Sequence, residues 1–187
     1  DNKFICFHDF TLKRILKRNL SVKNLNYSKI REISTKLGKP IPLLKDLLEA
    51  SNNKHALFIE IKPLFSKSLL KKLIIETSTY KKCVFISFKH ENIFSLLNIK
   101  KDTKVGLSFC PPTSVKKIIE KSNNKKINYL ILDRTYLMHK KIQKLKIKKY
   151  YYTIKTKSEF NKFKDKDYTQ VAHRSFHSPA ITLTKDG

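Results

Sequence analysis

Residues 56 to 62 read Ala56-Leu57-Phe58-Ile59-Glu60-Ile61-Lys62, a short apolar run that ends in charged side chains. A second run, Phe4-Ile5-Cys6-Phe7, ends in a similar way, at His8 and Asp9. Both runs are short and rich in β-branched and aromatic residues, which predicts buried strands rather than amphipathic helices. In a barrel of parallel strands, catalytic residues gather where strands meet the loops that follow them. These two boundaries are therefore the first candidates for a functional site.

The rest of the chain alternates between apolar strand-like runs and helical patterns that carry many lysines. Strands are expected over residues 83–88, 105–109, 129–133 and 150–154, and helices over 28–37, 43–50, 66–79, 92–98, 114–122, 140–146 and 157–164. This alternation predicts an α/β fold with right-handed crossovers between parallel strands. With only three glycines, the chain has no Gly-rich phosphate loop of the dinucleotide-binding or P-loop type. The pattern therefore favours a barrel over a doubly wound sheet.

No internal repeat or low-complexity linker divides the chain, so residues 1–187 are expected to form a single domain. The length of 187 residues lies below the roughly 250 that are typical of an eight-fold β/α barrel. Part of a barrel is therefore expected to be missing.

The charge is strongly basic, with 41 Lys and Arg against 15 Asp and Glu and a formal net charge of +26. The lysines alternate with apolar residues along nearly every expected helix, which is typical of solvated helix faces. A compositional bias explains this charge better than binding to nucleic acid does. No specific nucleic-acid partner is therefore expected. The positive field would still concentrate a small phosphate-bearing substrate around the protein.

Three cysteines, Cys6, Cys83 and Cys110, are widely separated and show no paired spacing. They are interpreted as free thiols in a reducing compartment. No apolar stretch approaches the eighteen or so residues of a membrane-spanning helix, and the first residues are not a signal peptide. A cytoplasmic location is therefore expected, and the oligomeric state is left open.

Five landmarks along residues 1 to 155 resemble, in their order, the motifs of the glycerophosphodiester phosphodiesterase family. The His-Asp and Glu-Ile-Lys elements are the specific ones, and each would mean little alone. The landmarks are Phe7-His8-Asp9 with the residues to Arg14, Ile41-Pro42-Leu43-Leu44, Ile59-Glu60-Ile61-Lys62, Ile86-Ser87-Phe88 and Tyr151-Tyr152-Thr153-Ile154.

The resemblance implies a TIM-type (β/α) barrel that hydrolyses a glycerophosphodiester to glycerol 3-phosphate and an alcohol. It implies His8 as one of two catalytic imidazoles, Glu60 as a ligand of a divalent cation (Ca²⁺ or Mg²⁺), and Lys62 as a phosphate contact. One imidazole can accept a proton and another can donate one near neutral pH, and a hard cation can offset charge on the phosphoryl oxygens.

The second imidazole of the family belongs to a His-Arg motif near the start of the chain, whereas here His173-Arg174 lies near the end. Leu183-Thr184-Lys185-Asp186-Gly187 follows and resembles the segment that leads into the family's His-Asp strand. Either the barrel is circularly permuted, or the residue order differs from that of the natural chain. Both alternatives place His173 beside His8 and give Arg174 a role on the phosphate.

The family also carries a Glu-x-Asp pair that supplies metal carboxylates, and here Ser178 and Ala180 stand at those positions. Neither residue can replace a carboxylate, so Glu60 alone would bind a cation weakly. The barrel is therefore predicted to be incomplete, or to have segments missing or permuted.

Simpler roles stay open for the same residues. Glu60 and Lys62 could pair with each other or with their neighbours, and Asp9 could either orient His8 or cap the turn that follows. Two rival functions stay open as well. One is a catalytically inactive basic barrel that binds an anionic partner, and the other is a related phospholipase D-type activity on sphingomyelin or lysophospholipid.

Overall fold

The computed structural model describes residues 1–154, 156–158, 171–173 and 182–183. Within these residues, seven strands form one sheet in the order β6-β5-β4-β3-β2-β1-β7, and every neighbouring pair is parallel. The strands are β1 (Leu57–Ile61), β2 (Cys83–Ser87), β3 (Val105–Phe109), β4 (Tyr129–Asp133), β5 (Lys148–Ile154), β6 (Val171–His173) and β7 (Thr182–Leu183). The predicted α/β alternation is confirmed.

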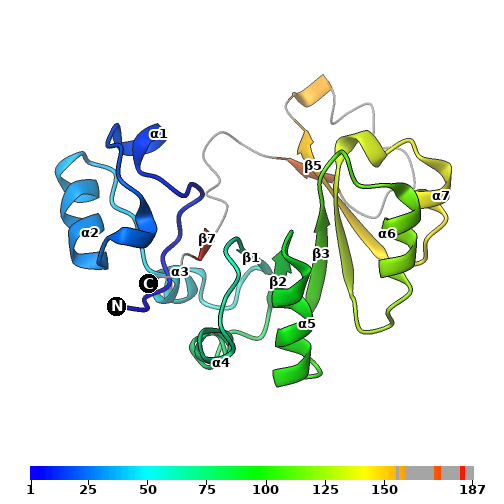
Figure 1. Ribbon diagram of the computed structural model, residues 1–187, viewed down its shortest axis with the longest axis horizontal. Helices are drawn as coiled ribbons and strands as arrows, with labels where there is room; N and C mark the ends of the chain where they lie inside the picture. The colour runs from blue at the N-terminus through cyan, green and yellow to red at the C-terminus, as the bar shows by residue number, and fades with distance from the viewer. Residues whose placement is uncertain (155, 159–170, 174–181, 184–187) are drawn as a thin grey trace.

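Helices connect successive strands and cover the outer side of the sheet (Figure 1). They are α4 (Lys67–Glu76), α5 (His90–Ile99), α6 (Val115–Ser122) and α7 (Lys140–Gln143), with a 3₁₀ turn η2 (Arg134–Tyr136) after β4. Ser66 and Ser114 cap α4 and α6, because their hydroxyls accept hydrogen bonds from the backbone N–H groups of Leu69 and Lys117. Alternate strand residues such as Ile59 and Ile61 pack against these helices in the main hydrophobic core.

The sheet curls strongly, as contacts between distant strands show. The Phe58 ring on β1 lies 5.5 Å from the Tyr129 ring on β4 and 4.6 Å from the Tyr150 ring on β5, measured between centroids. In a flat sheet with strands about 4.8 Å apart, strands three or four places apart would be separated by roughly 14–19 Å. The inner face must therefore close around these rings, as the wall of a barrel does.

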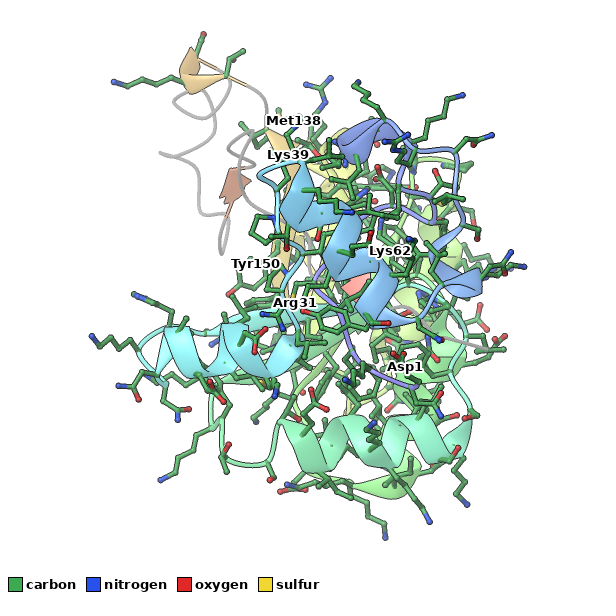
Figure 2. All side chains as sticks on the ribbon, turned by 90° about the vertical axis from the view of Figure 1, so that its left-hand side faces the viewer. Asp1, Arg31, Lys39, Lys62, Met138 and Tyr150 are labelled. Atoms are coloured by element: carbon green, nitrogen blue, oxygen red, sulfur yellow. The ribbon has the colours of Figure 1, made fainter. Side chains whose placement is uncertain are left out.

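An N-terminal segment, residues 1 to 43, forms a second hydrophobic cluster beside β1 (blue in Figure 1). Its elements are α1 (Lys13–Leu16), the 3₁₀ turn η1 (Val22–Asn24) and α2 (Tyr27–Lys36), and α3 (Leu44–Ser51) then leads to β1. The segment is anchored to the main core, because the Phe4 ring lies 5.8 Å from the Phe65 ring. In Figure 2, which faces this segment, long side chains with nitrogen at their tips reach outward from the helices in view.

The expected strand at Phe4–Phe7 is wrong, although all four residues are buried. The segment forms only an isolated antiparallel bridge between Ile5 and Leu43. The backbone N–H of Cys6 donates to the carbonyl of Pro42, and that of Leu44 donates to the carbonyl of Phe4. The backbone groups of this apolar run therefore form hydrogen bonds with the chain around the start of α3 and not with the sheet.

The other expected elements agree with the structure to within a few residues, except that α7 is shorter than the predicted helix 140–146 and β5 begins earlier. Most of the expected helix 157–164 lies outside the described residues. No helix in the described part of the chain has the length and apolar character needed to cross a membrane.

Candidate functional site

His8 is held by its neighbour Asp9. The Nδ1 atom of the imidazole lies 2.7 Å from Oδ1 of Asp9. Arg14, on α1, binds the same carboxylate through two hydrogen bonds. Its Nε donates to Oδ2 at 2.6 Å and its Nη2 donates to Oδ1 at 3.0 Å. Of the two roles expected for Asp9, this contact with the His8 ring supports the first, orientation of His8.

The electrostatics of this group fix the tautomer of His8. The hydrogen bonds from Arg14, reinforced by that from His8, hold the pKa of Asp9 below its ordinary value, although partial burial acts in the opposite direction. An ionised carboxylate can only accept hydrogen bonds, so the proton between the two residues belongs to Nδ1 of His8. The Nε2 atom is then the ring nitrogen that can take part in proton transfer to or from a substrate.

Glu60 and Lys62 lie on the inner side of the curled sheet. Ile59 and Ile61 of β1 pack against the helices, so the alternate positions 58, 60 and 62 face the other way. Both Glu60 and Lys62 are half-buried. In a barrel, the carboxyl end of a strand is where functional side chains are expected, and Glu60 and Lys62 lie at this end of β1.

Tyr152 faces the same interior from β5. Its ring lies 5.9 Å from the Phe88 ring at the end of β2, and its hydroxyl donates to the carbonyl of Phe109 at 2.8 Å. Burial raises the pKa of Tyr152 above its ordinary value, and the negative charges of Asp133 and Glu60 add to this effect. Glu60, Asp133 and Tyr152 therefore share one electrostatic environment. The sequence places Tyr152 in one of the five landmarks but indicates no role for its side chain.

Ser87 has a structural role at the strand ends. Its buried hydroxyl donates to the carbonyl of Ile61 at 2.5 Å, and the same oxygen accepts from the backbone N–H of Lys89 at 3.0 Å. These bonds tie the end of β2 to the residue directly before Lys62. The Ile-Ser-Phe landmark thus positions the neighbouring strand end.

The predicted residues of the chain's tail are only partly covered by the structure. His173 is the last residue of β6, where its backbone pairs with Ile154 of β5, and Arg174, Ser178 and Ala180 lie outside the described residues. Thr182 pairs with Glu60, so the last described strand extends the sheet beside β1. The two tail strands thus occupy the two opposite edges of the sheet. The meeting of the His173 and His8 side chains stays a prediction.

The described residues do not make a complete site for a hard cation. Within residues 1–154 and the three short described stretches, no three His, Cys, Asp or Glu side chains come together in a way that could hold a metal ion. Glu60 offers one carboxylate on the inner face, whereas Ca²⁺ and Mg²⁺ need several oxygen ligands.

Comparisons with known proteins agree on one family. No curated protein matches the chain in sequence. Among solved structures, an Oleispira antarctica phosphodiesterase in complex with the product sn-glycerol-3-phosphate is 16% identical with a TM-score of 0.79, over 92% of this chain and 76% of that one. A glycerophosphodiester phosphodiesterase from Thermotoga maritima is 19% identical with a TM-score of 0.72, over 91% and 75%. Another from Agrobacterium tumefaciens is 15% identical with a TM-score of 0.68, over 90% and 77%.

These structures share the fold of this chain and confirm the predicted barrel type. The chain spans about three quarters of the length of each. The model of the glycerophosphoryl diester phosphodiesterase family matches residues 1–175, which is most of the chain and includes His8, Glu60, Lys62 and the His173-Arg174 pair. The chain therefore belongs to the glycerophosphoryl diester phosphodiesterase family, a family of phosphoric diester hydrolases.

Proposed function

We propose that this protein hydrolyses glycerophosphodiesters to glycerol 3-phosphate and an alcohol. Family membership supports the reaction class, and a fold neighbour was solved with sn-glycerol-3-phosphate as its product. The observation that carries the proposal for this chain is the bond between Nδ1 of His8 and the ionised Asp9, which leaves the imidazole in a tautomer suited to acid–base work.

Hydrolysis requires a balanced movement of two protons. Water forms a new P–O bond while the P–O bond to the leaving alcohol breaks. One imidazole accepts the proton of the attacking water, and a second protonates the leaving alkoxide. We assign His8, acting through Nε2, as one of these groups and His173 as the other.

Phosphate binding is assigned to Lys62 and Arg174. Lys62 follows the Glu60 strand on its inner face, and the planar guanidinium of Arg174 could bind two phosphoryl oxygens at once. The net charge of +26 adds a positive field that raises the local concentration of a phosphodiester substrate.

A divalent cation, Ca²⁺ or Mg²⁺, is proposed with Glu60 as one ligand. When bound, such an ion would neutralise charge on the phosphoryl oxygens. The described residues alone do not fit a complete site, so no step of the reaction is derived through it. Loss of activity in EDTA and recovery with added Ca²⁺ or Mg²⁺ would support the assignment, and unchanged turnover in EDTA would remove it.

The direct test is release of glycerol 3-phosphate from glycerophosphocholine by the purified chain, with Ca²⁺ or Mg²⁺ present. His8→Ala should lower kcat by about 10²–10⁴-fold, the usual contribution of a general acid or base. His55→Ala is the matched control because His55 is exposed, and it should leave turnover unchanged. Full turnover by the His8→Ala variant would refute the assignment of His8.

The two rival functions give different results in the same experiments. An inactive basic barrel would show no turnover with any cation, and its binding to an anionic ligand would fall steeply with salt and would not need His8. The observation that favours this rival is the sequence, which has Ser178 and Ala180 where the family has its Glu-x-Asp pair. A phospholipase D-type enzyme would instead prefer sphingomyelin or lysophosphatidylcholine in a substrate panel.

A further inference from the structure

We propose that Arg14 is a positioning residue for His8, acting through Asp9. The expected effect on kcat rests on the proposed function. The structural claim does not: the Arg14 guanidinium holds the Asp9 carboxylate, and that carboxylate orients the His8 imidazole. No role for Arg14 follows from its position in the sequence alone.

The geometry of the three side chains carries the proposal. Arg14 uses two different nitrogens on the two different oxygens of Asp9, Nε on Oδ2 at 2.6 Å and Nη2 on Oδ1 at 3.0 Å. Such a two-point contact prevents the carboxylate from rotating, whereas a single bond would not. Oδ1 is also the oxygen that lies 2.7 Å from Nδ1 of His8. The orientation of the imidazole therefore depends on the position of the guanidinium.

The backbone holds Arg14 in place for this contact. The helix α1 has only four residues, which is too short to be stable alone. It is anchored by Leu12 and Leu16, which are fully buried in the cluster of the N-terminal segment. The Asp9 side chain is 18% exposed, so its contacts lie partly out of water, although the Arg14 side chain is 57% exposed. A partly buried, two-point pair is more rigid than an ordinary surface ion pair.

The charge of Arg14 has a second effect on the same group. Arg14 and His8 are the charged groups that act on Asp9, and Arg14 does most to hold the pKa of Asp9 below its ordinary value. Removing Arg14 would raise that pKa toward the ordinary value. As the pH falls, Asp9 would then be protonated at a higher pH than in the wild type and would stop accepting the proton of Nδ1. The hydrogen bond between Asp9 and Nδ1 of His8 should accordingly be lost at a higher pH in Arg14→Ala than in the wild type.

The experiment compares three variants in the glycerophosphocholine assay: Arg14→Ala, Arg14→Lys and Arg18→Ala. Arg14→Ala should lower kcat on the order of 10- to 100-fold with little change in KM, as is usual for outer partners of functional histidines. Arg14→Lys should recover part of the loss, because a lysine keeps the charge but cannot make the two-point contact. Arg18→Ala changes an exposed arginine of the same segment and should behave as wild type.

A double-mutant cycle separates positioning from folding. In a His8→Ala background, Arg14→Ala should cause no further loss of turnover, because a residue that acts through His8 has nothing left to position. Additive losses, or an Arg14→Ala variant as active as Arg18→Ala, would overturn the proposal.

A spectroscopic readout keeps the inference independent of turnover. Two-bond ¹H–¹⁵N correlation spectra report the tautomer of each of the six histidines, and the His8→Ala spectrum identifies the His8 signals. The wild type should show His8 protonated on Nδ1, and Arg14→Ala should show a mixture of tautomers. If the wild type turns over no substrate but this change is seen, the proposed function fails and the positioning role stands. An unchanged tautomer in a folded Arg14→Ala variant overturns the positioning role.

Discussion

Asn92 of α5 holds the turn that leads away from Glu60 and Lys62 by accepting, through its Oδ1, a hydrogen bond from the backbone N–H of Phe65 at 2.9 Å. Its Nδ2 donates to the carbonyl of Pro63 at 2.8 Å. The side chain is fully buried, so its amide replaces water for two backbone groups of this turn. Through this contact, a helix that follows β2 fixes the chain after β1.

Replacement of Asn92 by alanine should destabilise the fold. The change leaves the N–H of Phe65 and the carbonyl of Pro63 without their partner, and a buried unsatisfied group costs about 1–3 kcal/mol. Chemical denaturation should show a lower midpoint for Asn92→Ala. Asn98→Ala, at an exposed position of the same helix, is the control and should change the midpoint little. Equal stability of the two variants would mean that the turn does not depend on Asn92.

The strands β1 to β5 could be predicted from the sequence because each is an apolar run between lysine-rich helical patterns. Residues 105–109 and 129–133 were expected as strands and have these same bounds in the structure. Glu60 and Lys62 could also be placed at a strand end, since the period of two in a strand determines which residues share a face.

Other features could not be predicted because they depend on contacts between distant residues. The run Phe4–Phe7 has the composition of a strand, but its backbone pairs with the chain near Leu43. The local pattern of apolar residues therefore predicts that these side chains are buried, but it does not predict which segment their backbone pairs with. An asparagine in a helix, such as Asn92, carries no signal of the turn that it holds. The contact between Arg14 and Asp9 spans five residues, and no helical or strand period would place these two side chains together.

The three thiols should differ sharply in reactivity. Burial raises the pKa of Cys6 to about 12 and that of Cys83 to about 11, whereas Cys110 is exposed. Because the thiolate is the reactive form, a thiol reagent at pH 8 should label Cys110 first and reach Cys6 and Cys83 only on unfolding. Labelling followed by mass spectrometry measures this order, and Cys110→Ser should abolish the fast phase. Rapid labelling of Cys6 in the folded protein would contradict its burial.

Two positions on the inner side of β3 should respond in opposite ways to alanine. A Cβ added at Gly106 would lie 3.1 Å from Cγ2 of Ile86 and 3.1 Å from Cβ of Tyr129, tighter than ordinary contact. Gly106→Ala should therefore cost about 1–3 kcal/mol through overpacking. The hydroxyl of Ser108 is buried and has no hydrogen-bond partner among the described residues, so Ser108→Ala should be neutral or slightly stabilising.

Thermal denaturation of the two variants, in the same buffer, checks this pair. Both substitutions place alanine on one strand, and replacing a glycine would by itself stabilise the fold by reducing the freedom of the unfolded chain. A loss of stability in Gly106→Ala therefore reports the close contacts at that position. A Gly106→Ala variant as stable as wild type would show that Ile86 and Tyr129 can move apart at little cost.

The hydroxyl of Tyr152 should make stability depend on alkaline pH. In the folded protein, burial and the nearby charges of Asp133 and Glu60 raise its pKa above the ordinary value of 10.0. In the unfolded chain the phenol ionises near that ordinary value. Its contribution to stability is therefore fully present below pH 10 and is lost as the pH rises further, because the unfolded state loses its proton first.

Tyr152→Phe removes this titration together with the bond to the carbonyl of Phe109. At neutral pH the variant should be less stable by about 0.5–1.5 kcal/mol, the usual net value of a hydrogen bond. Above pH 10 its stability should fall less steeply than that of the wild type, so the two denaturation midpoints should approach each other. Parallel curves across this range would show that the phenol of Tyr152 ionises in the folded state as readily as in water, and that the interior beside Glu60 is open to solvent.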